Sequence, residues 1–290
     1  MDVRYLQSLI SVVDCGSIAE AARHEGLTAA AVSQRVQALE RRFGFALLSR
    51  VGSAAKPTNE CIDMLPRARR IVREVALLAG DADKVGLTGT LRIGAISTVL
   101  TGMLPSALMS LAQRGPNIRP VIVPGTSRAL YQSLLTGEID AAILVAPAFD
   151  IPKTLNSVSL KREELVFLSQ ANQRGEVNAA LASQPYIRYD PMAWGGRQAH
   201  LYIEEQGITP TLLCDLDALE TIVMLVESGM GVSLVPRWNG LEKLLNQSIA
   251  TPIAGSRYAR EIILLSSAQA DRPNMLAALQ EALQGALLEN

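Results

Sequence analysis

The chain has 290 residues, a length at which we expect two or three domains rather than one hydrophobic core. Its formal net charge is −1, no apolar run reaches transmembrane length, and its N-terminus lacks a signal-peptide pattern, so we expect a cytoplasmic protein without a membrane partner. The three cysteines, Cys15, Cys61 and Cys214, are far apart and lack metal-ligand spacing, which predicts reduced thiols and no metal site.

The first predicted elements are two short helices joined by a glycine turn. Ser17 and Glu20 form an S-x-x-E capping box that begins an alanine-rich helix. Gly26 suits the left-handed conformation at which such a helix ends. Thr28 then caps a second helix. The apolar residues of this second helix recur at helical spacing: Val32, Val36 and Leu39.

The remaining positions of the second helix form a polar face. They carry side chains of the kind that hydrogen-bond to base edges and phosphates: Ser33, Gln34, Arg35 and Gln37. Two short helices with a tight turn between them, and a polar face on the second, describe a helix-turn-helix that reads DNA. An ordinary αα-hairpin shares the alanine-rich contact and the glycine turn, so these features alone give both interpretations equal weight.

Two further features favour DNA binding. Residues 47–58 are typical of a short β wing, on which Arg50, Ser53 and Lys56 would lie beside the second helix, where phosphates run. Residues 1–73 contain eleven Lys and Arg against seven Asp and Glu, a net charge of +4, whereas the rest of the chain carries −5. A basic N-terminal region favours DNA through the release of counterions from the phosphates.

The N-terminal segment resembles the winged helix-turn-helix of LysR-type transcriptional regulators. The resemblance is carried by Leu6 and Leu9, Gly16-Ser17-Ile18, Ala21-Ala22, Val32-Ser33-Gln34-Arg35-Val36, Leu39-Glu40, Phe43-Gly44 and Leu47-Leu48-x-Arg50. It implies double-stranded promoter or operator DNA as a partner. The residues expected to contact DNA are Ser17, Thr28, Ala29, Ala30, Ser33, Gln34, Arg35, Arg50, Ser53 and Lys56.

The chain departs from the family pattern at three places. Thr28-Ala29-Ala30-Ala31 stands where Ser-Gln-Pro or Ser-Gln-Ser is usual. Leu47-Leu48-Ser49-Arg50 replaces L-F-x-R, and Thr58-Asn59-Glu60-Cys61 replaces T-x-A-G. The alanines offer only methyl contacts of the kind that suit thymine. The resemblance therefore predicts DNA binding but no particular operator sequence.

A helical linker is predicted after the wing. Its small and apolar residues alternate four and three apart, as in a heptad seam: Cys61, Leu65, Ala68, Val72, Val75, Ala79 and Ala82. An amphipathic helix packed on its own domain would show the same pattern. The resemblance implies instead the dimerising linker helix of the family, and with it a homodimer or homotetramer. Pro66 removes a backbone hydrogen bond and leaves open whether this helix is kinked.

From residue 90 onward, predicted strands alternate with helices, as in α/β proteins. Strands are expected at residues 91–96, 118–123, 141–145, 165–168, 186–189, 212–214, 232–235 and 262–266, and helices at 104–114, 127–136 and 273–288. This layout resembles the two-lobed, periplasmic-binding-protein-like (type 2) effector domain of the same family. The implied organisation is a winged helix-turn-helix at 1–58, a linker helix at 59–87 and an effector domain at 88–290. Lobe I would span about 88–162 and 261–290, and lobe II about 163–260.

Hydroxyl side chains follow two of the predicted strands. Ser97 and Thr98 come directly after one strand, and Thr126 and Ser127 follow the next, each pair opening a helix. Free backbone N–H groups and hydroxyls at helix N-termini form an anion site, and ligands of α/β sheets bind beyond the carboxyl ends of strands. N-capping alone explains any one of these residues equally well. Together they predict a cleft for a small anionic effector such as a carboxylate.

Two residues of the second lobe are further candidates for the same cleft. Trp194 and Arg197 follow a predicted strand end and would face the effector. A core or hinge position for Trp194, and a surface ion pair for Arg197, explain them equally well.

Catalysis and cofactors are not expected. His24 and His200 belong to no plausible triad or metal cluster, and the chain has no P-loop, no G-x-G-x-x-G after a strand and no G-x-S-x-G. A transcriptional regulator would have RNA polymerase as a further partner. The alternative is an α/β small-molecule-binding protein or enzyme whose N-terminal helices serve assembly only.

Overall fold

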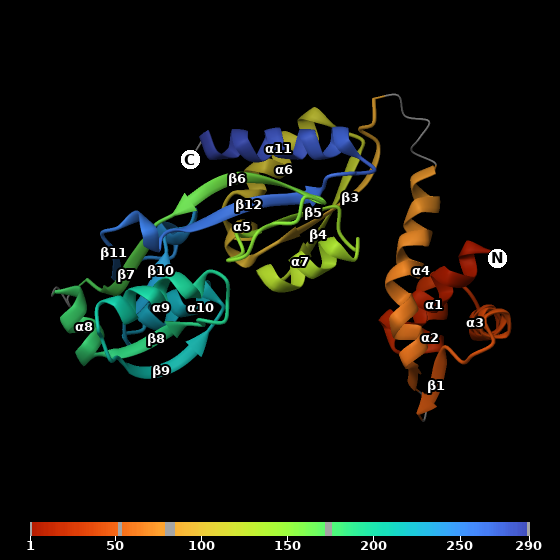
Figure 1. The fold of residues 1–290 in the computed structure, drawn as a ribbon, viewed down its shortest axis with the longest axis horizontal. Coiled ribbons are helices and arrows are strands. Elements are labelled where there is room, and N and C mark those ends of the chain that lie inside the picture. The colour runs from red at the N-terminus through yellow and green to blue at the C-terminus, as the bar shows by residue number, and fades with distance from the viewer. Residues whose placement is uncertain (1, 52–53, 79–84, 172–175, 289–290) are drawn as a thin grey trace. The chain divides into compact units, whose positions relative to one another are not determined.

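The structure is a computed structural model that describes residues 2–51, 54–78, 85–171 and 176–288 (Figure 1). It divides into two units, one built mainly from residues 1–84 and the other from residues 85–135 and 139–290. Within the described residues, no helix is both long enough and apolar enough to cross a membrane.

The N-terminal unit packs four helices and a hairpin around one small core. Its elements are α1 (Val3–Cys15), α2 (Ile18–Glu25), α3 (Ala29–Phe43), β1 (Leu48–Val51), β2 (Ala54–Pro57) and α4 (Asn59–Leu78). Helix α1 is central, because α2, α3 and α4 all pack against it. Its buried face carries Leu6, Leu9 and Val12.

The predicted helix-turn-helix is present. Ser17 begins α2 by accepting a hydrogen bond from the Glu20 N–H at 3.1 Å, but the Glu20 carboxylate binds Arg23 rather than completing the capping box. Gly26 ends α2 with φ of 66°, the left-handed conformation that glycine adopts without strain. Thr28 then caps α3 through its hydroxyl, which accepts from the Ala31 N–H at 3.2 Å.

The predicted wing is the antiparallel hairpin β1–β2. Polar contacts fix the chain on both sides of it. The Glu40 carboxylate accepts from the Leu47 N–H at 2.8 Å and from the Leu48 N–H at 3.2 Å. The Thr58 hydroxyl donates to the Ala46 carbonyl at 2.9 Å and accepts from the Cys61 N–H at 3.2 Å. The wing is thereby held to the end of α3 and the start of α4.

The heptad seam predicted on α4 is only partly available for a partner. Cys61 and Ala68 are buried in the core of their own unit, and Val72 packs against that core. Ile71 and Val75, one turn apart, are exposed instead. Helix α4 continues through Pro66, so this proline does not end the helix. Ala79 and Ala82 lie outside the described residues.

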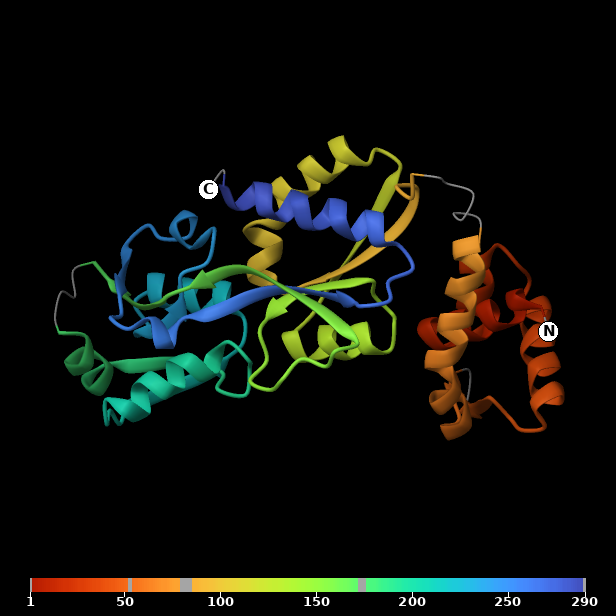
Figure 2. The same ribbon diagram turned by 45° about the horizontal axis from the view of Figure 1, so that its top comes forward.

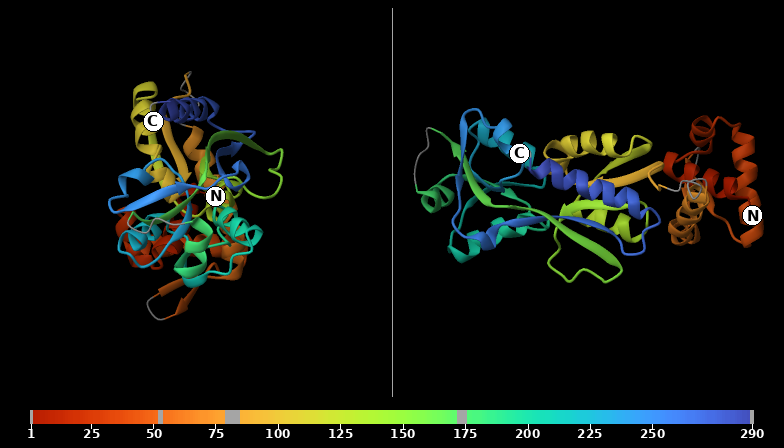
Figure 3. Two further views of the ribbon diagram at one scale, coloured as in Figure 1. Left: turned by 90° about the vertical axis from the view of Figure 1, so that its left-hand side faces the viewer. Right: turned by 90° about the horizontal axis from the view of Figure 1, so that it is seen from above.

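The first lobe of the C-terminal unit is a five-stranded sheet of order β4-β3-β5-β12-β6. Its strands are β3 (Gly89–Ala95), β4 (Ile118–Pro124), β5 (Ala141–Val145), β6 (Leu155–Glu163) and β12 (Arg260–Ser267). Strand β3 runs parallel to β4 and β5, whereas β12 is antiparallel to β5 and β6. The helices are α5 (Ser97–Thr101), α6 (Leu104–Arg114), α7 (Ser127–Leu135) and α11 (Pro273–Leu288). Helices α6 and α11 lie side by side on one face and α7 covers the other (Figure 1; Figure 3, right).

The second lobe has two small cores on either side of its strands. Strand β7 (Leu165–Gln170) pairs antiparallel with β10 (Ser233–Pro236) and β11 (Ser248–Pro252), and β8 (Pro185–Tyr189) is parallel to β9 (Thr211–Leu216). A bridge between Tyr186 and Val232 connects β8 to this sheet. The helical elements are α8 (Val177–Ser183), α9 (Gly196–Glu205), α10 (Leu219–Glu227) and the 3₁₀ turns η1 (Leu241–Lys243) and η2 (Ser256–Tyr258).

Two long strands, β6 and β12, connect the lobes and pair with each other along their length (Figure 2). Where they enter the second lobe, Arg260 of β12 pairs with Glu163 of β6 at 2.7 Å, and both residues are 3% exposed. Arg260 also donates to the Thr98 hydroxyl at 2.9 Å and the Tyr189 hydroxyl at 3.3 Å. Burial disfavours the charged guanidinium, but Glu163 and Tyr189 together outweigh this effect, and the pKa of Arg260 is raised.

We predict that Arg260→Met destabilises the C-terminal unit by about 3 to 5 kcal/mol, because it leaves the Glu163 carboxylate buried without its partner. The double variant with Glu163→Met should recover most of this loss. Arg237 forms an exposed pair with Glu242 and serves as the control, for which Arg237→Met should cost less than about 1 kcal/mol. Urea unfolding followed by circular dichroism measures all three. Equal losses in the single and double variants would contradict the prediction.

Candidate DNA-binding interface and effector cleft

The exposed face of α3 is a continuous polar and small-residue surface. Ala30, Gln34, Gln37 and Arg41 are spaced four, three and four residues apart, so they share one face of the helix, and all four are exposed. Thr28 and Ala29 are exposed at the start of the same helix. The structure therefore exposes four of the ten predicted DNA contacts along α3: Thr28, Ala29, Ala30 and Gln34. Gln37, which the sequence analysis placed on the polar face, shares this exposed surface, and Arg41 extends it beyond the residues named from sequence.

Ser33 is half-buried beside this face. Its hydroxyl accepts a hydrogen bond from the Gln37 side-chain amide at 3.3 Å. This contact orients Gln37 along the surface of α3. Ser33 therefore lies next to the exposed face and acts on it by orienting the Gln37 side chain.

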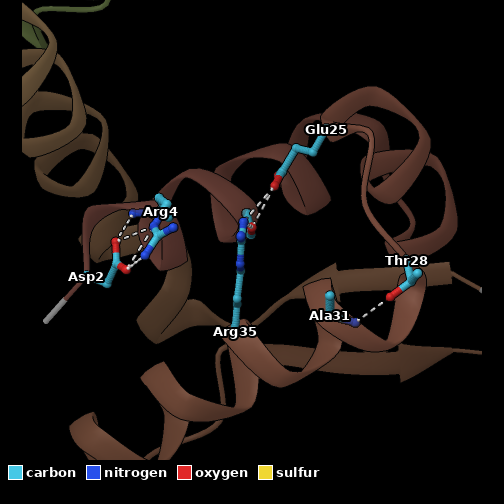
Figure 4. Close-up of polar contacts among 7 residues, drawn as sticks. Asp2, Arg4, Glu25, Thr28, Ala31 and Arg35 are labelled. Carbon is cyan, nitrogen blue, oxygen red and sulfur yellow. Dashed lines mark hydrogen bonds and ion pairs between the residues drawn. The ribbon is translucent and has the colours of Figure 1, made fainter.

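Arg35 differs from the other predicted readers, because its guanidinium is bound inside the N-terminal unit. It donates to the Ser8 hydroxyl at 3.0 Å and to the Glu25 carboxylate at 3.3 Å (Figure 4). Only 22% of the Arg35 side chain is exposed. The sequence groups Arg35 with Ser33 and Gln34, whereas the structure directs it toward α1 and α2.

The wing offers one described basic side chain. Lys56 is exposed on β2, and Arg50 lies on β1 opposite Ala55. The Arg50 side chain and the whole of Ser53 lie outside the described part of the structure. Ser17 is half-buried and its hydroxyl is occupied in capping α2.

The C-terminal unit contains a cavity of about 630 Å³ lined by both lobes. All four predicted hydroxyl residues line it. Thr98 and Ser127 are buried and serve the fold: Thr98 binds Arg260, and the Ser127 hydroxyl accepts from the Val145 N–H at 3.2 Å. Ser97 and Thr126 are exposed. The cavity is below called the cleft.

Charged side chains also line the cleft: the buried Arg260, which is paired with Glu163, and three further residues. Arg128 follows Thr126 and Ser127 in the first lobe, whereas Asp190 and Asp217 come directly after β8 and β9 in the second. Partial burial and the negative charge of Asp190 raise the pKa of Asp217, against the opposing effect of Arg260. The sequence analysis missed these residues, although the strand-end argument that found Ser97 applies equally to both aspartates.

The two candidates from the second lobe, Trp194 and Arg197, lie at different places. Trp194 lines the cleft and contacts two rings of the first lobe, with centroids 5.7 Å from Tyr131 and 5.6 Å from Phe149. Arg197 does not line the cleft. It lies exposed on α9 and lines a second cavity of about 290 Å³, together with Arg162 and Arg257. This cavity adjoins the cleft, since Trp194 and Arg260 line both.

Metal binding finds no geometric support in the part of the chain that the structure describes, where no three His, Cys, Asp or Glu side chains are grouped to hold an ion.

Comparison with known proteins identifies both units. Residues 3–61 match the model of the bacterial regulatory helix-turn-helix protein, lysR family, and residues 84–288 match the LysR substrate binding domain. The HTH-type transcriptional regulator CzcR of Bacillus cereus is 26% identical over 238 residues, which cover 82% of this chain and 81% of CzcR. TtuA of Agrobacterium vitis, another HTH-type transcriptional regulator, is 25% identical over 248 residues, with coverage of 82% and 81%.

The fold is shared with solved structures. Full-length CbnR complexed with its target DNA has a TM-score of 0.70 at 20% sequence identity, covering 99% of this chain and 100% of that chain. The predicted fold class, an N-terminal winged helix-turn-helix followed by a periplasmic-binding-protein-like α/β domain, is thereby confirmed. The chain belongs to the LysR family of DNA-binding transcriptional regulators, which carry an effector-binding domain and are not enzymes.

Proposed function

We propose that α3 and the wing hold operator DNA, and that a small metabolite with an anionic group binds in the cleft and modulates promoter binding or activation. The observation that carries this proposal is the cleft itself. Ser97 and Thr126 lie exposed at the carboxyl ends of the parallel strands β3 and β4, where α/β proteins bind ligands. A ligand that contacts both lobes favours one cleft geometry, and it regulates DNA binding only if its affinity differs between geometries.

The anionic group is expected on the first-lobe side. The nine-residue helix α7 begins there, its N-terminal end favours an anion, and Arg128 supplies a positive charge. Thr126 precedes the helix and caps it, because its hydroxyl accepts from the Ala129 N–H at 3.3 Å. Helix α5 has only five residues, so Ser97 contributes mainly through its hydroxyl. Trp194 lines the cleft from the second lobe. Arg197 lines another cavity and is not part of this proposal.

We further propose the domain boundaries predicted from sequence: a winged helix-turn-helix at 1–58, a linker helix at 59–87 and an effector domain at 88–290. The protein would act in the cytoplasm, where bacterial promoters and RNA polymerase are found, as a homodimer or homotetramer. Helix α4 supports such an assembly, because Ile71 and Val75 expose apolar surface on one side of it.

We predict that Lys56→Ala weakens binding to all DNA sequences alike and reduces the slope of log affinity against log salt by about one unit, because one phosphate contact is lost. Fluorescence anisotropy titrations at several salt concentrations measure the slope. Lys243 of η1, exposed in the effector domain, provides the control variant Lys243→Ala, which should leave the slope unchanged. An unchanged slope in Lys56→Ala would remove Lys56 from the interface.

We predict that Ser97→Ala weakens effector binding about ten- to a hundredfold, the effect of removing one hydrogen bond to a charged group. Basal DNA binding should survive. A thermal-shift screen of organic and amino acids first supplies the ligand, which at a hundred times its Kd adds about 2.7 kcal/mol of stability. Paired titrations of effector and DNA then compare wild type, Ser97→Ala and the control Ser106→Ala, whose serine lies on α6 and does not line the cleft. Unchanged effector affinity in Ser97→Ala would make Ser97 a structural residue only.

We predict that Ile71→Asp weakens self-association at least about a hundredfold, because each protomer would bury an unpaired charge. Tight DNA binding should be lost with it, since useful selectivity needs two recognition helices about 34 Å apart on the duplex. Val72, the seam position predicted from sequence, is unsuitable because it packs on its own core. Arg70→Asp places the same carboxylate at a neighbouring exposed position and is the control. Sedimentation showing an unaltered assembly in Ile71→Asp would move the interface elsewhere.

A further inference from the structure

Three polar residues from three helices meet inside the N-terminal unit. Glu25 is the last residue of α2, Arg35 lies in the middle of α3, and Ser8 is on α1. The Ser8 hydroxyl donates to the Glu25 carboxylate at 2.7 Å, and Arg35 donates to both at 3.0 and 3.3 Å (Figure 4). Together they are here called the Ser8–Glu25–Arg35 cluster. It fixes α3 against the two helices that support it.

The cluster lies between the core and the surface. Ser8 is fully buried, whereas 16% of the Glu25 side chain and 22% of the Arg35 side chain are exposed. A carboxylate at the C-terminal end of a helix is disfavoured by the helix dipole. The Oε1 atom of Glu25 is also buried without a hydrogen-bond partner among the described residues. Both features cost stability, so the position of Glu25 is poorly explained by stability alone.

A functional reason for the position of Glu25 is that its carboxylate neutralises the charge of Arg35. Arg35 belongs to the helix whose exposed face, with Gln34 and Gln37, is turned to solvent. An arginine free to turn from this helix toward a phosphate would attract every DNA sequence equally, because phosphate contacts carry no sequence information. Pairing with Glu25 neutralises that charge and withdraws the guanidinium from the surface. Sequence-independent attraction falls, while the orientation of α3 stays fixed.

We infer that Glu25 is a positioning residue for DNA specificity, which with Ser8 holds the Arg35 guanidinium inside the domain and away from the DNA phosphates. The inference rests on the proposal that α3 reads DNA, and it removes Arg35 from the predicted set of direct contacts. Base readout then belongs to the exposed residues of α3, with Arg35 fixing their orientation.

The test compares two duplexes, one that the wild-type protein selects from a random-sequence pool and one unrelated sequence of equal length. Affinity is measured at several salt concentrations for the full chain. Glu25→Gln keeps the shape and an acceptor for Arg35 but removes the charge. Glu20→Gln is the matched control, because it removes the same charge from the same helix, where the partner Arg23 is already exposed. Ser8→Ala removes the second contact that holds Arg35.

In Glu25→Gln, we expect binding to the unrelated duplex to strengthen, the salt slope to steepen by up to about one unit, and the ratio of specific to non-specific affinity to fall about tenfold. Ser8→Ala should shift the ratio in the same direction by a smaller factor. Adding Arg35→Gln to Glu25→Gln should return the slope to the wild-type value, since the released charge is then absent.

Three results would overturn the inference. An unchanged ratio of specific to non-specific affinity in Glu25→Gln would leave Glu25 with a structural role only. An equal change in Glu20→Gln would show that the effect comes from net charge and not from the position of Glu25. A salt slope in the double variant about one unit below wild type would show that Arg35 contacts a phosphate in the native protein. These results leave the proposed reading by α3 intact. A wild-type protein that selects no sequence would contradict that proposal and this inference together.

Discussion

The geometry of the cleft depends on one buried guanidinium, that of Arg260. Its hydrogen bonds reach Glu163 on a connecting strand, Thr98 in the first lobe and Tyr189 in the second. A buried charge is tolerated only when its donors are satisfied, so these three partners are held at fixed positions. The walls of the cleft near Thr98 and Tyr189 are therefore placed by the same interaction that joins β6 to β12. Any movement between the lobes has to keep the hydrogen bonds of Arg260 or replace them with others.

Arg35 shows the same principle on a smaller scale in the other unit. In both places an arginine is bound by a carboxylate inside the protein, and its charge is not available to a ligand or to DNA. Exposure separates them, since Arg260 is 3% exposed and the Arg35 side chain 22%. Water screens the second pair more effectively, so Arg35 can be released by a single substitution without the collapse expected for Arg260. Because the Arg35–Glu25 pair can be broken without unfolding the domain, Glu25 can act on DNA specificity as inferred above.

Local signals in the sequence were sufficient for most of the fold. Gly26 and Thr28 mark the helix-turn-helix because backbone conformation and capping are decided within a few residues. The strands β6 and β11 were not predicted, because β6 is largely polar, β11 is short, and both are only partly buried. Pairing with β12 and β7 creates them. Side-chain partners could not be predicted either, because they too depend on residues that are distant in the chain. Ser97 and Thr98 are neighbours, yet only Thr98 is used by Arg260, 162 residues away in the chain.

The distribution of charge in the cleft restricts how an anionic effector can lie. Asp190 and Asp217 are on the second-lobe side, and the raised pKa of Asp217 reports its partial burial together with the mutual repulsion of these carboxylates. An anionic group placed there would add a third negative charge, while the nearby Arg260 is already paired with Glu163. On the first-lobe side it meets the start of α7 and Arg128 instead. For the effector proposed above, this distribution of charge favours an orientation with the anionic end toward the first lobe and a neutral or hydrogen-bond-donating end toward the second.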